Sequence, residues 1–431
     1  MLKTLINAFK EREIRKKMLL TLLMILVFRL GCFIPVPGIA SGSFKSLVQD
    51  KNSLLSIMST ITGGSLQNGT LFALGIIPFI NAFIIMQLLT LIIPPLDRLS
   101  KQGEEGRKKI TQITRYLAIL LAVIQGVGIC LGYGDGMFDE TFGSASLTMA
   151  LVIIMFAGGS CFVMWLADRI TEYGIGNGTS LIIFVGILAS AGQSLVKAFS
   201  AIGAGGNPAK DVWLIIAFLA VVLFVFVFII LVDLAERKIT IQYAKQVKGN
   251  KMYGGQSTHI PMKVNASGVM PIIFASSFLM FPQMIASFWP HSDFYAWWVK
   301  WLGMGTPIYI TLMCLLILFF SFFYSQIQFN PEDISKNIQQ NGGFIPGIRP
   351  GRPTADFLKK INNRITLFGA IFLAIIALIP SVVFKFIGGE QNGLANSFSA
   401  TGLLIVVSVA MEFDMQLQNQ LMMKHYKGFL K

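Results

Sequence analysis

The stretch VWLIIAFLAVVLFVFVFIILVDL (212–234) contains no ionisable residue before Asp233 and is long enough to cross a lipid bilayer. A bilayer core of about 30 Å requires about 20 consecutive apolar residues in a helix. Similar runs occur along the whole chain. Together with 212–234, they predict membrane-spanning helices at residues 18–36, 72–94, 114–134, 148–168, 179–196, 268–289, 307–327, 366–387 and 397–413. The pattern predicts an all-α integral membrane protein with about ten transmembrane helices.

The composition of the whole chain excludes a single water-soluble core. Of the 431 residues, 54% are hydrophobic and 13% are charged, whereas soluble domains carry about 25% charged residues. The formal net charge is +14. In a membrane protein, excess positive charge first indicates the topology and a contact with anionic lipids.

Lysine and arginine are distributed unevenly among the segments that connect the predicted spans. An even number of spans places most of the 35 such residues on one side of the membrane, in segments 1–17, 95–115, 235–265, 328–365 and 415–431. Because cytoplasmic segments are enriched in lysine and arginine, we predict that this side is cytoplasmic. Both termini are then cytoplasmic as well.

Three segments do not fit simple spans. Residues 54–70, LLSIMSTITGGSLQNGT, are apolar but are interrupted by Gly63 and Gly64. This length indicates a re-entrant or plug-like half-helix, with an ordinary external loop as the alternative. Segments 235–265 and 328–365 are longer than most connections in compact domains, and they predict protruding cytoplasmic hairpins or docking loops.

A glycine-rich linker at 202–206 divides the chain into halves 1–200 and 201–431, each with five predicted spans. An odd number of spans per half gives two halves of opposite orientation, as in inverted-repeat secondary transporters. Ion-coupled transporters place ionisable residues near mid-membrane, and the predicted spans nearly lack them, apart from Arg29. This scarcity counts against a secondary transporter, which stays an alternative.

The chain lacks the residue patterns of a catalytic or metal site. It contains no nucleotide-binding loop, no HExxH motif and no convincing pair of nucleophile and base. The cysteines lie singly in apolar runs and the histidines are scattered, at Cys32, Cys130, Cys161, Cys314, His259, His291 and His425. We expect no enzymatic activity, no metal and no cofactor.

Isoleucines recur at helical spacing in several spans. Ile76 and Ile80 are four residues apart, as are Ile183 and Ile187, so each pair shares one helix face. Lipid contact and helix packing are the ordinary reasons for this spacing. A ring of such side chains around an aqueous path would instead gate the path by dewetting.

Several long strings of the sequence resemble the SecY family of protein-conducting channels, and the resemblance covers essentially the whole chain. The strings include FALGIIPFINAFIIMQLLT (72–90), EEGRKKITQITRY (104–116), ITEYGIGNGTSLIIF (170–184) and FNPEDISKNIQQNGGFIPGIRPG (329–351). The resemblance implies two pseudo-symmetric five-helix halves around a central pore. It assigns the pore ring to Ile76, Ile80, Ile183, Ile187, Ile273 and Ile405.

The resemblance also implies moving parts. A plug segment, residues 55–68, includes Ile57, Ile61, Gly63, Gly64 and Leu66. A lateral gate lies between spans two and three on one side and seven and eight on the other, with Gln87 and Asn265 at its polar positions. Signal sequences open this gate, hydrophobic segments leave through it into lipid, and unfolded polar preproteins pass through the pore.

The long cytoplasmic loops are then docking sites for the motor ATPase SecA or for a translating ribosome. The residues implied are Arg349, Lys245, Lys248 and Lys251, of which the lysines suit ribosomal RNA phosphates. The small membrane subunits SecE and SecG complete the complex, and the bacterial cell membrane is the expected location. A membrane insertase or assembly scaffold without a continuous pore is a further alternative.

Overall fold

The structure is a computed structural model of the 431-residue chain. It describes residues 2–39, 59, 62–132, 145–200, 208–243, 246–248, 251–253, 257–265, 268–287, 292–303, 306–387 and 400–429. Ile57, Ile61 and Lys245 lie outside the described residues, so their predicted roles stay predictions.

Helices dominate the described part of the chain, and a helix coincides with each predicted span. The helices of the first half are α1 (Leu2–Lys10), α2 (Arg12–Gly31), α5 (Ile77–Ile92), α6 (Pro94–Ser100), α7 (Glu104–Gly132), α8 (Ala145–Tyr173) and α9 (Gly178–Ser200). Those of the second half are α10 (Pro208–Leu234), α11 (Met270–Ser287), α12 (Asp293–Leu302), α13 (Pro307–Gln328), α14 (Pro331–Gln340), α15 (Arg352–Ile387) and α17 (Ala400–Phe429).

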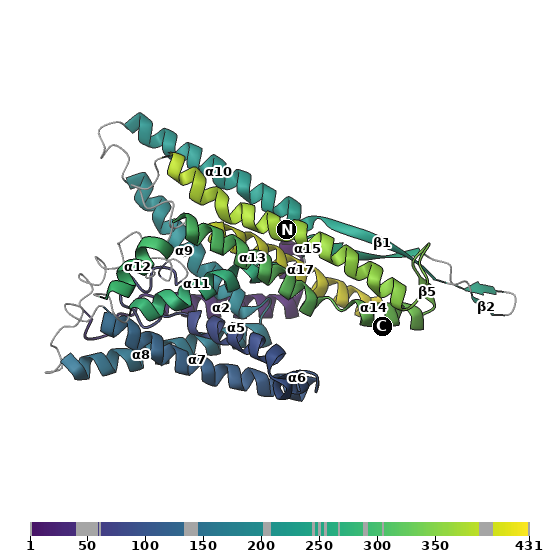
Figure 1. Ribbon diagram of the computed structural model, residues 1–431, viewed down its shortest axis with the longest axis horizontal. Coiled ribbons are helices and arrows are strands. Elements are labelled where there is room, and N and C mark those ends of the chain that lie inside the picture. Colours follow the sequence, from purple (N-terminus) through teal and green to yellow (C-terminus); the bar gives the residue numbers. More distant parts are fainter. Residues whose placement is uncertain are drawn as a thin grey trace.

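The long helices pack into two neighbouring groups (Figure 1). In the first group, α8 packs against α2, α7 and α9, while α5 packs against α7. In the second group, α13 packs against α11 and α15, while α17 packs against α10 and α15. The groups meet where α17 contacts α9 and where α11 contacts α5 and α7.

Six of the described helices are long and apolar enough to cross a membrane, namely α7, α8, α9, α10, α13 and α15. The bent pair of α5 and α6, with an angle of 105° between its parts, would make a seventh. α2 begins with basic residues and contains Arg29, and α11 contains Pro282, so neither is a long uninterrupted apolar helix. The number of crossings therefore stays a prediction.

Among the predicted boundaries that differ from the structure are those of the second span and of segment 328–365. The second span was expected from residue 72, but α5 begins at Ile77 because turns occupy the residues before it and Gly75 has a φ of 54°. Such a positive φ ends helical geometry. Segment 328–365 was expected to be a protruding hairpin or docking loop, and it contains α14 and the first turns of α15.

A small β-sheet departs from the predicted all-α class. β1 (Glu236–Tyr243) pairs antiparallel with β4 (Ser257–Lys263) and β5 (Gly343–Phe344) in the order β4-β1-β5. A second antiparallel pair joins β2 (Gln246–Lys248) to β3 (Lys251–Tyr253) and projects from one end of the molecule (Figure 1). The sheet lies within the two segments whose polar composition suggested loops.

The β-sheet has its own small core outside the helix bundle. Ile239 and Ile241 of β1 are two residues apart and are both buried, as expected for side chains on one face of a strand. They belong to one apolar cluster with Ile338 of α14 and Leu358 of α15. The described parts of segments 235–265 and 328–365 thus form one packed unit.

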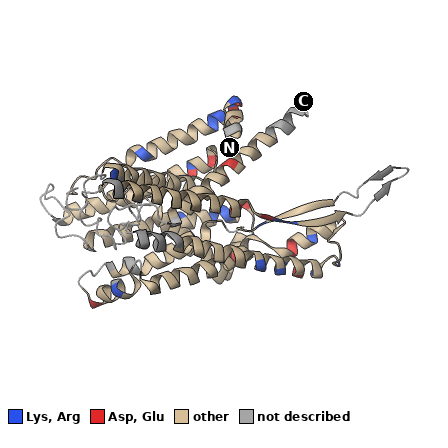
Figure 2. Ribbon diagram, turned by 90° about the horizontal axis from the view of Figure 1, so that it is seen from above, with Lys and Arg blue, Asp and Glu red and all other residues tan. Residues whose placement is uncertain are grey.

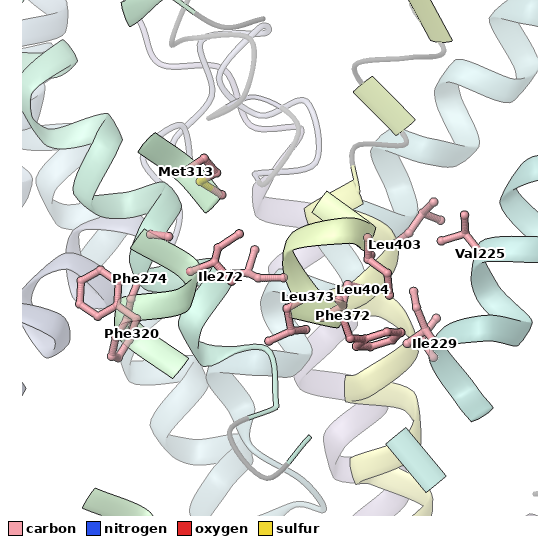
Figure 3. Close-up of a cluster of buried hydrophobic side chains, with 14 of the residues drawn as sticks. Val225, Ile229, Ile272, Phe274, Met313, Phe320, Phe372, Leu373, Leu403 and Leu404 are labelled. Atoms are coloured by element: carbon pink, nitrogen blue, oxygen red, sulfur yellow. The ribbon is translucent and has the colours of Figure 1, made fainter. Parts of the chain in front are cut away.

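The largest buried cluster among the described residues lies mainly in the second helix group, and Figure 3 shows ten of its residues labelled. Phe274 of α11 and Phe320 of α13 meet edge to face, with ring centroids 5.7 Å apart. Leu373 of α15 and Leu404 of α17 are fully buried in the same cluster. Figure 2 shows long stretches of helix without charged residues, while Lys and Arg gather chiefly toward the β-strands.

Candidate functional site

The six isoleucines assigned to the pore ring lie in one apolar cluster. They come from both helix groups: Ile76 and Ile80 at the start of α5, Ile183 and Ile187 in α9, Ile273 in α11, and Ile405 in α17. Four of them are buried, with exposed fractions of 3–4%. Ile80 and Ile273 are partly buried and pack against the others. The cluster places apolar side chains from both groups at one point between them.

The position of Ile76 follows from a turn that α8 supports. Ile76 is the residue before the first turn of α5, and Pro78 occupies the second helical position, where a missing backbone N–H has no cost. Ser160 of α8 donates a hydrogen bond from Oγ to the carbonyl oxygen of Gly75 at 3.0 Å. The turn before α5 is therefore tied to its neighbour in the bundle.

The described part of the plug segment lies directly against this cluster. Arg29 of α2 donates a hydrogen bond from Nη1 to the carbonyl oxygen of Gly63 at 3.2 Å. A Cβ atom placed on Gly63 would lie 3.2 Å from the backbone of Gly186. Gly186 lies in α9 between Ile183 and Ile187, so the plug segment contacts the helix that carries two of the six isoleucines.

Local hydrogen bonds join the described residues of the plug segment, which are 59 and 62–68. Gly64 donates its backbone N–H to the carbonyl oxygen of Ser59, and Ser65 donates its hydroxyl to the carbonyl oxygen of Thr62, both at 2.8 Å. Gly63 and Gly64 have φ values of 71° and 85°, which L side chains rarely adopt. Leu66 is fully buried in a second cluster, with residues of α7 and α8.

The two polar residues assigned to the lateral gate have different surroundings. The Oε1 atom of Gln87 in α5 is buried and has no hydrogen-bond partner among the described residues. Asn265 lies between β4 and α11 and donates from Nδ2 to Oδ1 of Asp233 in α10 at 2.8 Å. Ser408 of α17 donates to Oδ2 of the same carboxylate at 2.7 Å. Asn265 thus belongs to a polar link between three segments.

Sequence reasoning missed Gln125 of α7. It is 2% exposed, and its Oε1 atom has no hydrogen-bond partner in the described structure. Ala122 and Ile129, on the same helix face, share an apolar cluster with Met280 of α11. Gln125 is therefore a buried amide near the contact between α7 and α11. The available signal was a single glutamine inside an apolar run.

Arg349 lies in an ordered turn between β5 and α15. Its carbonyl oxygen accepts a hydrogen bond from the hydroxyl of Thr354 at 2.8 Å, while its side chain is exposed. Ser335 of α14 donates its hydroxyl to the carbonyl oxygen of Gly351 at 2.7 Å. The backbone around Arg349 is therefore held in place, and the guanidinium group is free to meet a partner.

Two of the three lysines assigned to docking, Lys248 and Lys251, belong to the β2–β3 hairpin, whereas Lys245 lies outside the described residues. Lys248 and Lys251 are paired across the two strands. This register places the two residues at the end of the hairpin that is farthest from the helix bundle.

Comparison with known proteins gives consistent matches. A family model described as SecY matches residues 70–413. The protein translocase subunit SecY of Streptomyces galbus is 41% identical over 100% of both chains, and that of Bacillus subtilis is 40% identical over the same share.

Two solved structures share the fold. One, described as a protein-conducting channel, is 22% identical, covers 94% of this chain and 91% of its own, and has a TM-score of 0.68. Sec61 in the canine ribosome–channel complex is 21% identical, with the same coverage and a TM-score of 0.64. The family model and the full-length relatives together show that the chain belongs to the SecY family.

Proposed function

We propose that this chain is the channel-forming subunit of a protein translocase, a passive conduit for unfolded polypeptide and not an enzyme. The observation that carries the proposal is the cluster of six isoleucines from both helix groups, with the glycines of the plug segment against it. The two five-helix groups are the two halves of the channel, and about ten helices cross the membrane. The chain lies in the bacterial cell membrane with both termini in the cytoplasm.

An apolar ring suits this task for physical reasons. It offers an unfolded chain no strong binding site, so that transit tolerates many sequences. A charged ring would retain segments of opposite charge, and a wide polar ring would leak ions. A narrow apolar constriction excludes water and ions when no polypeptide fills it. In the closed state, the plug segment completes this seal.

The contact between α5 and α7 on one side and α11 and α13 on the other is the proposed lateral gate. Its buried amides, Gln87 and Gln125, leave acceptor atoms without partners among the described residues. Polar groups between membrane helices contribute about 1 kcal/mol or less each, and an unpaired acceptor weakens the closed contact. Such groups thereby set how hydrophobic a signal sequence has to be.

The cytoplasmic unit of β1, β4, β5, α14 and the start of α15 is the proposed docking site. The exposed guanidinium group of Arg349 suits a motor ATPase such as SecA, and the lysines at the hairpin tip suit ribosomal RNA. Small membrane subunits of the SecE and SecG type, signal sequences, unfolded preproteins and anionic lipids are the other proposed partners.

The test is photocrosslinking in membranes with a stalled secretory chain as bait. A photoreactive residue replaces Ile80, Ile183 or Ile273 in turn. We expect crosslinks from the polar part of the stalled chain to all three positions. Leu223 of α10, whose side chain is 67% exposed on the outside of the bundle, is the matched control and should crosslink to lipid alone. Crosslinks confined to such outer positions would exclude the central pore and favour a scaffold.

A further inference from the structure

Helix α12 presents three different faces around its circumference. Successive residues of an α-helix are about 100° apart, so Phe294, Trp297 and Trp301 lie within one narrow sector. Their side chains are 50%, 52% and 46% exposed. The contacts of α12 with α11 and α13 leave this aromatic sector uncovered within the described structure.

The other two faces of α12 have ordinary partners. Tyr295, Trp298 and Leu302 form a second sector and are only partly exposed, which places the protein-facing side there. The third sector carries Asp293 and Lys300, both exposed to the surroundings. α12 therefore has a packed side, a polar side and an exposed aromatic side.

The position of α12 at the end of the helix bundle indicates that lipid lies against its aromatic sector. α12 joins α11 to α13 and lies at the end of the bundle opposite the β-strands (Figure 1). α13 is one of the helices that can cross a membrane. A short helix between the ends of membrane helices lies at the level of the lipid headgroups, so the surface beside it is continuous with the lipid-facing surface of the bundle.

The residue types match that level of the bilayer. Tryptophan is enriched at membrane–water interfaces, because its ring is largely apolar and its indole N–H reaches polar groups. Lys300 lies with Nζ 5.9 Å from the ring centroid of Trp301, and a lysine beside an aromatic face extends its charge toward phosphate and water. Three half-exposed aromatic side chains on one face are unusual for a surface in water.

We propose that α12 is an interfacial membrane anchor, with Phe294, Trp297 and Trp301 inserted among the lipid headgroups and upper acyl chains. Asp293 and Lys300 lie on the sector beside the aromatic one, from which their charged groups reach water. Because α12 connects α11 to α13, the anchor fixes the depth at which both helices end. The inference requires only that the helix bundle lies in a membrane, and it is independent of what the pore conducts.

The test is electron paramagnetic resonance of the full chain in lipid vesicles, with the four native cysteines replaced by alanine. A nitroxide label is attached in turn at Phe294, Trp297, Trp301, Ala296 and Lys300. Frequent collision of the label with oxygen indicates that it lies in lipid, and frequent collision with a water-soluble nickel chelate indicates that it lies in water. We expect labels at the three aromatic positions to favour oxygen and labels at Ala296 and Lys300 to favour nickel.

Two control labels separate the possible outcomes. A label at Leu223 in α10 reports the acyl region, and one at the exposed Lys336 in α14 reports water. If the labels at the aromatic positions collide with the nickel chelate as often as the label at Lys336, the proposal is overturned. It is also overturned if these labels collide with neither reagent, because such shielding indicates that protein covers the aromatic sector. A label at Leu223 that favours nickel would instead refute the membrane placement of the whole bundle, and the proposed channel with it.

Labelling an aromatic position removes the aromatic ring itself, so a second experiment changes one residue and keeps the label at another. Trp297→Glu, with the label kept at Phe294, should shift that label from oxygen toward nickel, because a carboxylate resists entry into the interface. Ala296→Glu, on the water-facing sector, should leave the label unchanged. Equal behaviour of the two variants would contradict an anchor formed by the aromatic sector.

Discussion

The guanidinium group of Arg29 holds the backbone of Gly63, with 3.2 Å between Nη1 and the carbonyl oxygen. The same group lies 5.2 Å from the ring centroid of Phe33, so the cation contacts an aromatic ring just after α2 and a carbonyl oxygen of the plug segment. Because the acceptor is a backbone atom, the contact depends on the shape of the plug segment and not on its side chains.

Replacing Arg29 should loosen the plug. Arg29→Met keeps much of the side-chain length but removes the donor, and hydrogen bonds to charged groups contribute about 1.5–3 kcal/mol. Since 1.4 kcal/mol corresponds to a factor of ten, we expect the closed state to lose roughly tenfold in relative population. Ion conductance of the idle channel in planar bilayers should rise. Arg29→Lys retains a donor and should conduct fewer ions than Arg29→Met. An idle Arg29→Met channel with unchanged ion conductance would show that Arg29 does not hold the plug segment.

A polar residue in the isoleucine cluster should admit water. Ile405 is 4% exposed, and an unpaired buried amide costs about 1–3 kcal/mol, so Ile405→Asn favours a hydrated, partly open ring. We expect raised ion leak in reconstituted vesicles and export of preproteins that have weak signal sequences. Ile405→Val keeps the ring apolar and should behave like the parent. Unchanged leak and unchanged signal stringency in Ile405→Asn would remove Ile405 from the ring.

Charge reversal at Arg349 should uncouple the motor without disturbing the fold, because the side chain is exposed while the backbone carries the local hydrogen bonds. Arg349→Glu should abolish ATP-driven export into vesicles, with normal assembly of the complex. Arg352→Glu makes the same charge change three residues away, at another exposed position, and serves as the control. Normal export by Arg349→Glu would exclude the docking role.

The link through Asp233 should stabilise the closed bundle cooperatively. Asn265→Ala and Ser408→Ala each remove one donor from the carboxylate, and hydrogen bonds to charged groups contribute about 1.5–3 kcal/mol. We expect each variant to unfold at a lower temperature in detergent. Because both donors share one acceptor group, the double variant should deviate from additivity. Strict additivity would show that the two contacts act independently.

Two adjacent glycines in α8 provide a packing test. A Cβ atom on Gly159 would lie 1.9 Å from the carbonyl oxygen of Leu71, whereas one on Gly158 would meet nothing within 4 Å. Gly159→Ala therefore forces α8 away from the turn before α5, and overpacking costs about 1–3 kcal/mol. Gly158→Ala should be neutral or stabilising in the same thermal unfolding measurement. Equal stability of both variants would contradict the close approach.

Helix positions could be predicted from the sequence because the apolar length that crosses a bilayer is a local property. The 212–234 run required no knowledge of its neighbours, and α10 covers it completely. The β-sheet was not predicted, because its strands are short and their composition resembles that of loops. The alternation at Ile239 and Ile241 in β1 was a local signal for a buried strand face.

The candidate site was partly accessible from the sequence. The i, i+4 spacing showed that Ile183 and Ile187 share a face, but spacing cannot say which helix lies opposite. Long-range pairings were invisible for the same reason: Ser408 meets Asp233 across 175 residues of sequence. The assignment of the six isoleucines to a ring came from the family resemblance, and no local pattern would have supplied it.

The length of α15 sets the distance between the bilayer core and the turn that contains Arg349. Its 36 residues extend about 54 Å at 1.5 Å per residue, and a bilayer core accounts for about 30 Å of that. The remaining turns form a rigid pillar beneath the turn that contains Arg349. In the proposed channel, a motor or ribosome bound at Arg349 would stand at a fixed height above the lipid, and a one-turn deletion in this part of α15 would bring that partner closer to the bilayer.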